Sequence, residues 1–181
     1  NFNALSKEID QVINNAKKNN LSLILSINTN PNEFNDHFEL IRKYNGIYLS
    51  YGLHPCEINS FEQIKFLNFD QFCNNIKVIG IGETGLDFFH SNKHRDKQIL
   101  SFEKHIEASL KYNLPLIIHQ RNSEDEIMNI LTNYKKNNLK IVFHCFTGST
   151  KLLEFCIENH YFISLSGIIT FKNSSKLRSV V

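Results

Sequence analysis

The feature that most constrains the fold is a regular alternation of two kinds of segment. Short apolar runs rich in Ile, Leu, Val and Phe alternate with segments whose apolar residues recur at helical spacing. Because runs that are apolar throughout suit parallel strands covered on both faces, the alternation predicts an α/β domain with right-handed crossovers. An open doubly wound sheet and a (β/α)8 barrel both satisfy this order. The predicted strands cover residues 21–28, 47–53, 78–82, 114–119, 140–146 and 162–169.

The helical segments show one-sided apolar stripes. Ile99, Phe102, Ile106 and Leu110 share one face, and residues 60–76 predict two short helical pieces. No linker, charge run or low-complexity tract divides the chain. We therefore predict a single domain over residues 1–181.

Composition limits the classes of function. A net charge of +2 over 181 residues gives no general argument for nucleic acid. No apolar run approaches the roughly 18 residues that cross a bilayer, so we expect no membrane partner, and no protein partner can be inferred. The four cysteines form no CxxC pair, and no signal-like segment is present, which predicts reduced thiols and a cytoplasmic location.

Polar residues with catalytic chemistry follow four consecutive predicted strands. The carboxyl ends of strands are where parallel α/β folds assemble their sites, so these side chains are expected to converge. Two histidines and a carboxylate are a usual ligand set for a divalent transition metal, and a carboxylate can bridge to a second ion. Metals so bridged can polarise a phosphoryl group and activate water. The residues are His54, Glu83 and Asp87, His119 and Arg121, and His144.

Each of these signals has a structural alternative. A single histidine at a strand end is more often a hydrogen-bonded structural residue, and Asp87 could equally hold a backbone turn or an arginine. The glycines around Glu83 match GxGxxG spacing, but an acid stands where a dinucleotide phosphate would bind. The remaining histidines are predicted to lie on the surface. They are His37, His90, His94, His105 and His160.

At these residues the chain resembles the TatD family of metal-dependent deoxyribonucleases, part of the superfamily of (β/α)8 metal-dependent hydrolases. The resemblance covers nearly the whole chain and keeps the family's motif order. The matching motifs are GLHP (52–55), GETGLD (82–87), Gln98 with Phe102, LPLIIHQR (114–121), HCFTGS (144–149) and SLSGIITFKNS (164–174).

The resemblance implies a two-metal site that hydrolyses phosphodiester bonds of DNA with metal-activated water, as a 3′–5′ exonuclease on single strands. Two divalent ions are expected per intact site, either Mg, Mn or Zn. By this resemblance Glu83 bridges both ions, while His119 and His144 complete the second. His54 would line the pocket near the scissile phosphate, and the catalytic residues would be Glu83 and His54. Arg121 would contact a substrate phosphate or pair with a structural acid.

Two parts of the family pattern are absent. The sequence contains no His-x-His, and the late acidic motif of the family is missing. We therefore expect an incomplete (β/α)8 TIM-type barrel of about six β/α units, with the first and last strands missing. Two alternatives to the DNA nuclease stay open. The first is a superfamily hydrolase that acts on a small ester or amide, and the second is an inactive fragment of the nuclease.

Overall fold

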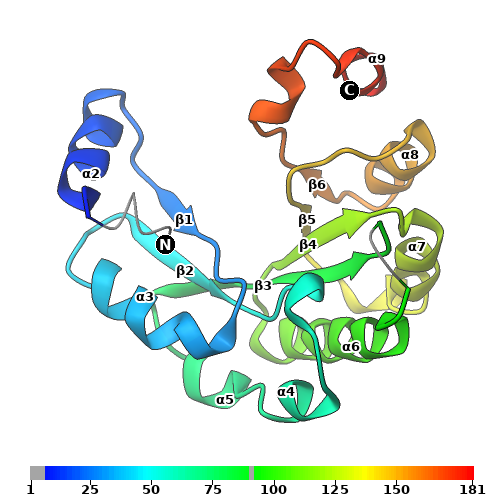
Figure 1. The fold of residues 1–181 in the computed structure, drawn as a ribbon, viewed down its shortest axis with the longest axis horizontal. Coiled ribbons are helices and arrows are strands. Elements are labelled where there is room, and N and C mark those ends of the chain that lie inside the picture. The colour runs from blue at the N-terminus through cyan, green and yellow to red at the C-terminus, as the bar shows by residue number, and fades with distance from the viewer. Residues whose placement is uncertain (1–6, 90–91) are drawn as a thin grey trace.

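A computed structural model describes residues 7–89 and 92–181 (Figure 1). Its six strands form one sheet in which every neighbouring pair is parallel and the spatial order follows the chain order. Each strand falls within or overlaps a predicted run, so the parallel α/β prediction is confirmed. The strands are β1 (Ile24–Ser26), β2 (Ile47–Tyr51), β3 (Val78–Asp87), β4 (Leu116–Arg121), β5 (Ile141–Phe143) and β6 (Phe162–Ile163).

The sheet curls, and helices α3, α6 and α7 lie along its convex side (Figure 1). This curled half-barrel with alternating helices matches the incomplete (β/α)8 barrel predicted from the sequence. In the described residues no helix combines the length and the apolar character needed to cross a bilayer. The helices are α2 (Ile9–Lys18), α3 (Phe34–Ile41), α4 (Phe61–Lys65), α5 (Phe69–Phe72), α6 (Arg95–Tyr112), α7 (Glu124–Thr132), α8 (Thr150–Glu158) and α9 (Ser175–Val180). Short 3-10 turns cover Pro31–Glu33, Pro55–Glu57, Lys135–Asn137 and Gly167–Thr170.

The region 60–76 forms two short helices, as its pattern predicted. Ser60 and Gln63 make a reciprocal capping box at the start of α4, in which each side chain accepts a backbone N–H of the other. The side chain of Asn68 accepts the N–H of Gln71 and begins α5. Two separate N-caps within nine residues therefore divide the region.

Strand β3 differs from the prediction. The predicted strand ends at residue 82, but β3 continues through Glu83 to Asp87. Gly82 and Gly85 lie within the strand with φ of +135° and +133°, values that an L side chain rarely adopts. The strand is paired with β4 before and after a register shift between Ile81 and Thr84, where Gly82 and Glu83 lie.

Strand β6 is shorter than predicted. The apolar run 162–169 gives a strand over only Phe162–Ile163, and a 3-10 turn takes up Gly167–Thr170. The N–H of Ser164 still donates to Phe143 O at 2.9 Å, after which the chain leaves the sheet. Phe162 is 73% exposed, so little packing at this position extends the strand.

Two histidines predicted to lie on the surface are buried, which corrects that prediction. His37 is 7% exposed and His105 is fully buried. His105 Nδ1–H donates to Ser101 O at 2.6 Å, and its Nε2 accepts the N–H of Leu53 at 3.1 Å. Burial lowers the pKa of His105 to about 4, so the ring is neutral. His90 lies outside the described residues.

Candidate metal centre

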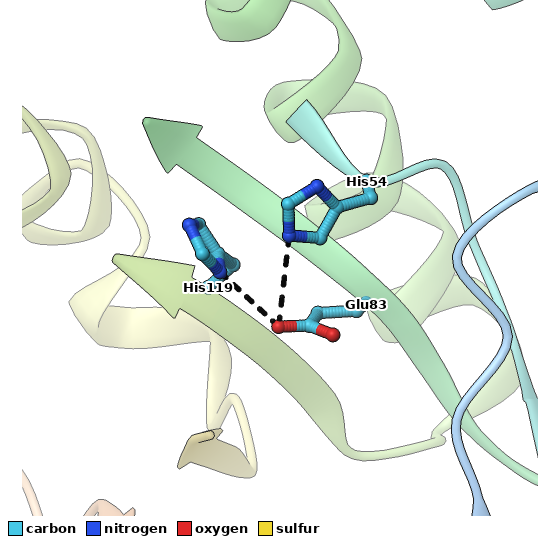
Figure 2. Close-up of side chains that lie close together, drawn as sticks. All are labelled: His54, Glu83 and His119. Carbon is cyan, nitrogen blue, oxygen red and sulfur yellow. Dashed lines mark hydrogen bonds and ion pairs between the residues drawn. The ribbon is translucent and has the colours of Figure 1, made fainter. Parts of the chain in front are cut away.

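Three predicted site residues meet at the carboxyl ends of adjacent strands. His54 follows β2, Glu83 lies in β3 and His119 lies in β4. His119 Nδ1 is 3.2 Å from Glu83 Oε1, and His54 Nε2 is 3.9 Å from the same oxygen. Both rings point at this one oxygen (Figure 2). The three ligand atoms all lie within 4.8 Å of one another, a spacing that one metal ion can span.

Close backbone contacts place Glu83. A Cβ added at Gly82 would lie 2.5 Å from Ile117 O, and one at Gly85 would lie 2.1 Å from His119 O. The two glycines therefore allow β3 to approach β4 on both sides of Glu83. The N–H of Glu83 also donates to Asn28 O at 2.9 Å, which ties the residue to the segment after β1.

His54 is oriented by its own backbone turn. The N–H of Cys56 donates to His54 Nδ1 at 3.1 Å, so the neutral ring carries its proton on Nε2, the nitrogen that faces Glu83. Burial, followed by the nearby His119, lowers the pKa of His54 to about 4. The backbone N–H of His54 donates to Thr29 O at 2.8 Å. His54 is thus presented as a neutral hydrogen-bond donor.

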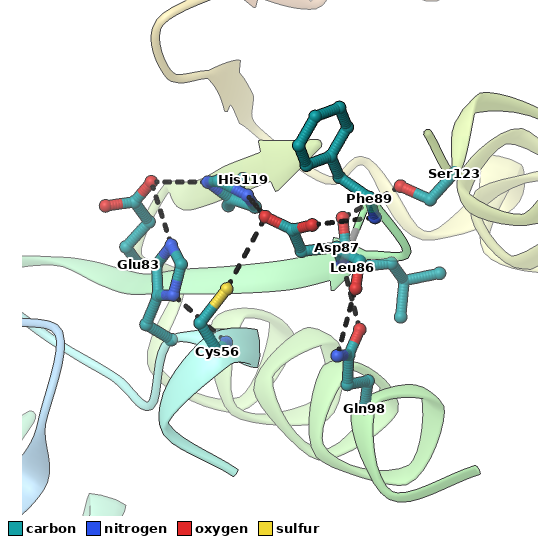
Figure 3. Close-up of polar contacts among 9 residues, drawn as sticks. Cys56, Glu83, Leu86, Asp87, Phe89, Gln98, His119 and Ser123 are labelled. Atoms are coloured by element: carbon teal, nitrogen blue, oxygen red, sulfur yellow. Dashed lines mark hydrogen bonds and ion pairs between the residues drawn. The ribbon is translucent and has the colours of Figure 1, made fainter. Parts of the chain in front are cut away.

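His119 is held between two carboxylates (Figure 3). Its Nε2 donates to Asp87 Oδ2 at 2.9 Å while Nδ1 faces Glu83. Gln98 fixes the backbone of Asp87: its Oε1 accepts the Asp87 N–H at 2.9 Å, and its Nε2 donates to Asp87 O at 3.2 Å. A carboxylate behind a histidine ring is the usual support for a metal-ligating histidine. Asp87 therefore directs Nδ1 of His119 toward Glu83.

The charges of the cluster depend on one another. Burial alone would raise the pKa of Glu83, but the hydrogen bond with His119 and the surrounding imidazoles outweigh it and lower the pKa. Burial alone would lower the pKa of His119, yet its bonds to Glu83 and Asp87 raise it. The ring can donate to both carboxylates only as an imidazolium. A metal ion bound at Nδ1 would replace a proton there.

His144 lies at the end of β5, where its N–H donates to Ile118 O at 2.8 Å. It is not among the three residues whose ligand atoms lie within 4.8 Å. Its ring is nevertheless close enough for its charge to lower the pKa of both His54 and Glu83. The structure therefore places His144 beside the cluster, and its assignment as a ligand stays a prediction.

Arg121 lies two residues beyond His119 on β4. Its backbone is paired with Asp87 of β3, and its guanidinium lies over the Phe89 ring, 3.6 Å from the ring centroid. Among the ion pairs of the described chain none involves Arg121. The structural acid that was considered as a partner of Arg121 is thus not found among the residues that the structure describes.

Two supporting residues, Cys56 and His105, were not predicted from the sequence. Cys56 donates its S–H to Asp87 Oδ2 at 3.4 Å, and burial, followed by that carboxylate, raises the pKa of its thiol to about 11. His105 supports Leu53, the residue before His54. A signal for His105 was present, because it lies three residues after Phe102 on the apolar stripe of α6. No sequence signal pointed to Cys56.

Comparison with known proteins identifies the family of the chain. A family model described as TatD related DNase matches residues 1–181. The chain belongs to the TatD-related DNase family. The resemblance found in the sequence motifs is thereby confirmed, and the chain stands among the TatD-type metal-dependent hydrolases.

Two relatives of this TatD-family chain differ in what their names say of their function. An uncharacterized metal-dependent hydrolase of Buchnera aphidicola subsp. Baizongia pistaciae is 34% identical over 174 residues, which cover 96% of this chain and 65% of that protein. A 3'-5' ssDNA/RNA exonuclease TatD of Erwinia amylovora is 26% identical over 178 residues, covering 97% of this chain and 69% of that protein. The chain thus spans about two thirds of the length of these relatives.

A solved structure supports the barrel. The crystal structure of YJJV, a TatD homologue from Escherichia coli K12, superposes with a TM-score of 0.87 at 26% identity. The match covers 99% of this chain and 70% of that one. The curled sheet of this TatD-family chain is therefore part of the same barrel fold.

The cluster has the chemistry that a divalent metal requires. Imidazole nitrogens and a carboxylate oxygen suit Zn, Mn and Fe, and a carboxylate oxygen also suits Mg. Glu83 has a lowered pKa and is ionised near neutral pH, while Asp87 presents Nδ1 of His119 toward it. The donor set of this TatD-family chain therefore fits a metal ion at Glu83 and His119.

Proposed function

We propose that the protein is a metal-dependent phosphodiesterase that cleaves DNA, acting on single strands from the 3′ end. The observation that carries the proposal is the His119 ring held between Asp87 and Glu83 at the carboxyl end of β4. This is the supported histidine–carboxylate arrangement expected of a hydrolytic metal site. The Erwinia amylovora relative named as a 3'-5' ssDNA/RNA exonuclease supports the choice of nucleic acid as substrate.

We assign Glu83, His119 and His144 as metal ligands, with Glu83 shared between two ions, either Mg, Mn or Zn. When bound, such ions supply Lewis-acid activation of a phosphoryl oxygen and of water. The low pKa of Glu83 supports its part, because the carboxylate stays ionised without help from a metal. The position of His144 at the next strand end, within electrostatic reach of Glu83, supports its part.

His54 and Arg121 have separate roles in this proposal. His54 donates from Nε2 to an oxygen of the scissile phosphate, because Cys56 N–H occupies its Nδ1. Arg121 binds a substrate phosphate, since its charge lies two residues beyond His119 and meets no carboxylate among the ion pairs of the described residues. We also propose a cytoplasmic location, which the four free cysteines support.

Hydrolysis of a 5′-labelled single-stranded oligonucleotide in Mn²⁺ or Mg²⁺ tests the proposal. We expect a ladder of products shortened from the 3′ end, and no cleavage by Glu83→Gln or after removal of metal with EDTA. Glu158→Gln, an exposed position at the end of α8, is the matched control and should cleave like the unmodified protein. Equal cleavage by Glu83→Gln would refute the assignment of the site.

A small ester or amide is the alternative substrate, because a net charge of only +2 does not specifically favour DNA. The same preparation is therefore to be assayed against small phosphoesters, lactones and amides. Turnover of one of these with no oligonucleotide cleavage would replace the nuclease proposal and leave the metal assignment in place.

A further inference from the structure

We propose that Phe89 and Arg121 form a stacking site for a nucleobase, one step outward from the metal centre. The inference rests on the proposed action on single-stranded nucleic acid and specifies how a strand is held. It assigns to Arg121 a stacking contact with a base in addition to the proposed contact with a phosphate.

The first observation is the geometry of the pair. The guanidinium of Arg121 lies 3.6 Å from the centroid of the Phe89 ring, which places the cation on the aromatic face. The ring is 49% exposed and the arginine is exposed. An arginine held flat in this way keeps its outer face for a second planar group and its N–H donors for an anion in the same plane.

The second observation is the position of the pair on the two strands. Phe89 lies two residues after Asp87, and Arg121 lies two residues after His119. The pair therefore lies just beyond the Asp87–His119 contact along both segments. Two hydrogen bonds fix this step: the N–H of Phe89 donates to Asp87 Oδ1 at 3.0 Å, and the N–H of Phe88 donates to Arg121 O at 2.9 Å.

The third observation is an adjoining cavity of about 620 Å³ that both residues line. The cavity also carries acidic residues from the first turn of α7, but each has a partner. Glu126 pairs with Arg95, Asp125 pairs with Lys151 at 2.6 Å, and Glu124 accepts hydrogen bonds from Ser149.

Of the charged residues that line this cavity, only Arg121 is without such a partner among the contacts found in residues 7–89 and 92–181. Glu124 keeps its negative charge, but both of its oxygens already accept from Ser149, so the hydrogen-bond donors left for a ligand are those of Arg121. A planar base with a neighbouring phosphate, which accepts these donors, matches the part of the cavity beside Arg121.

Together these observations describe a site for one nucleotide of a single strand. The base stacks on the outer face of the Arg121 guanidinium, which Phe89 supports from behind. A phosphate of the same strand accepts hydrogen bonds from the guanidinium edge. Stacking on arginine and aromatic planes holds single strands with little regard to sequence, because every base has a planar face.

Binding without hydrolysis tests the site. Fluorescence anisotropy in EDTA should compare 5′-labelled oligothymidylate with an oligomer of abasic sites of equal length and charge. We expect the unmodified protein to prefer the base-bearing strand by roughly ten-fold. Arg121→Lys keeps the charge but loses the plane, and Phe89→Leu loses the aromatic support. Both should remove most of the preference. Arg42→Lys, at an exposed arginine that pairs with Glu39 at the end of α3, is the matched control and should keep the preference.

Equal binding of the two strands by the unmodified protein would overturn the inference, and so would a preference that survives in both variants. Thermal unfolding of each variant serves to exclude misfolding, and the comparison of the two strands on the unmodified protein requires no variant. A preference without any oligonucleotide cleavage in Mn²⁺ would contradict the proposed function and leave the stacking site standing. Cleavage without a preference for the base-bearing strand would contradict the stacking site and leave the proposed function standing.

Discussion

His119 is bound from behind by Asp87, whose Oδ2 accepts the Nε2–H of the ring at 2.9 Å. The same carboxylate accepts the N–H of Phe89 through Oδ1 at 3.0 Å. Both oxygens of Asp87 are thus used to fix the direction of a single imidazole. The ring can turn its other nitrogen away from Glu83 only by breaking this bond.

Asp87→Asn should weaken metal binding about 10- to 100-fold, because it keeps the size of the side chain but removes its charge and one of its two acceptors. Isothermal titration with Mn²⁺ measures the effect. Asp125→Asn, an acid on the exposed side of α7, is the control and should bind like the unmodified protein. Unchanged affinity in Asp87→Asn would show that His119 does not need this support.

Divalent metal should raise the unfolding temperature of the protein, since a ligand that binds only the native state stabilises it. At a free Mn²⁺ concentration about 100 times the dissociation constant the gain is about 2.7 kcal/mol. EDTA should reverse it, and Glu83→Gln should abolish it. Differential scanning calorimetry with and without metal provides the measurement. An equal gain in Glu83→Gln would place the ion elsewhere.

The buried His105 should make stability depend on pH. Its pKa falls from 6.5 to about 4 on folding, so protons bind more tightly to the unfolded chain. The stability is complete above pH 6.5 and decreases as the pH falls toward 4, by about 3 kcal/mol in total. His105→Gln can accept from Leu53 and donate to Ser101 without titrating, and should flatten this dependence.

Urea unfolding in EDTA at several values between pH 4 and pH 7 tests this prediction as a difference between the two proteins. His37 and His54 also have lowered pKa values, but they act in both proteins and cancel. Parallel pH curves for the two proteins would contradict the assignment to His105.

Gly85→Ala should destabilise the protein by at least about 2 kcal/mol, because its Cβ would lie 2.1 Å from His119 O at a φ of +133°. Gly167→Ala is the matched control: nothing lies within 4 Å of the Cβ it would add. Chemical denaturation of both variants gives the comparison. A similar cost at the two positions would mean that β3 and β4 separate easily.

The order and direction of the strands followed from the alternation of apolar runs and helical stripes, because each crossover helix requires a parallel neighbour. The meeting of His54, Glu83 and His119 was predicted on the same ground. Three successive strand ends lie on one edge of a parallel sheet. The sequence did not give the distances between these side chains. It did not reveal that His144 lies outside the 4.8 Å cluster.

Other features depend on contacts between distant segments. The extension of β3 to Asp87 brings Gly82 and Gly85 against carbonyl oxygens of β4, whereas the apolar run in the sequence ends at residue 82. The buried position of His105 depends on the N–H of Leu53, 52 residues away. The tautomer of His54 depends on Cys56 N–H, a detail of local turn geometry that a motif does not specify.

The metal centre draws two of its three closest residues from β3 and β4, the innermost pair of the six strands. Local openings of a protein begin where contacts are few, and here β1 and β6 form the two ends of the sheet. Local opening at β1 or β6 leaves the hydrogen bonds between β3 and β4 intact. The amide protons in the hydrogen bonds between β3 and β4 should therefore exchange with solvent only when the whole domain unfolds. The lifetime of the site is then the lifetime of the native state itself.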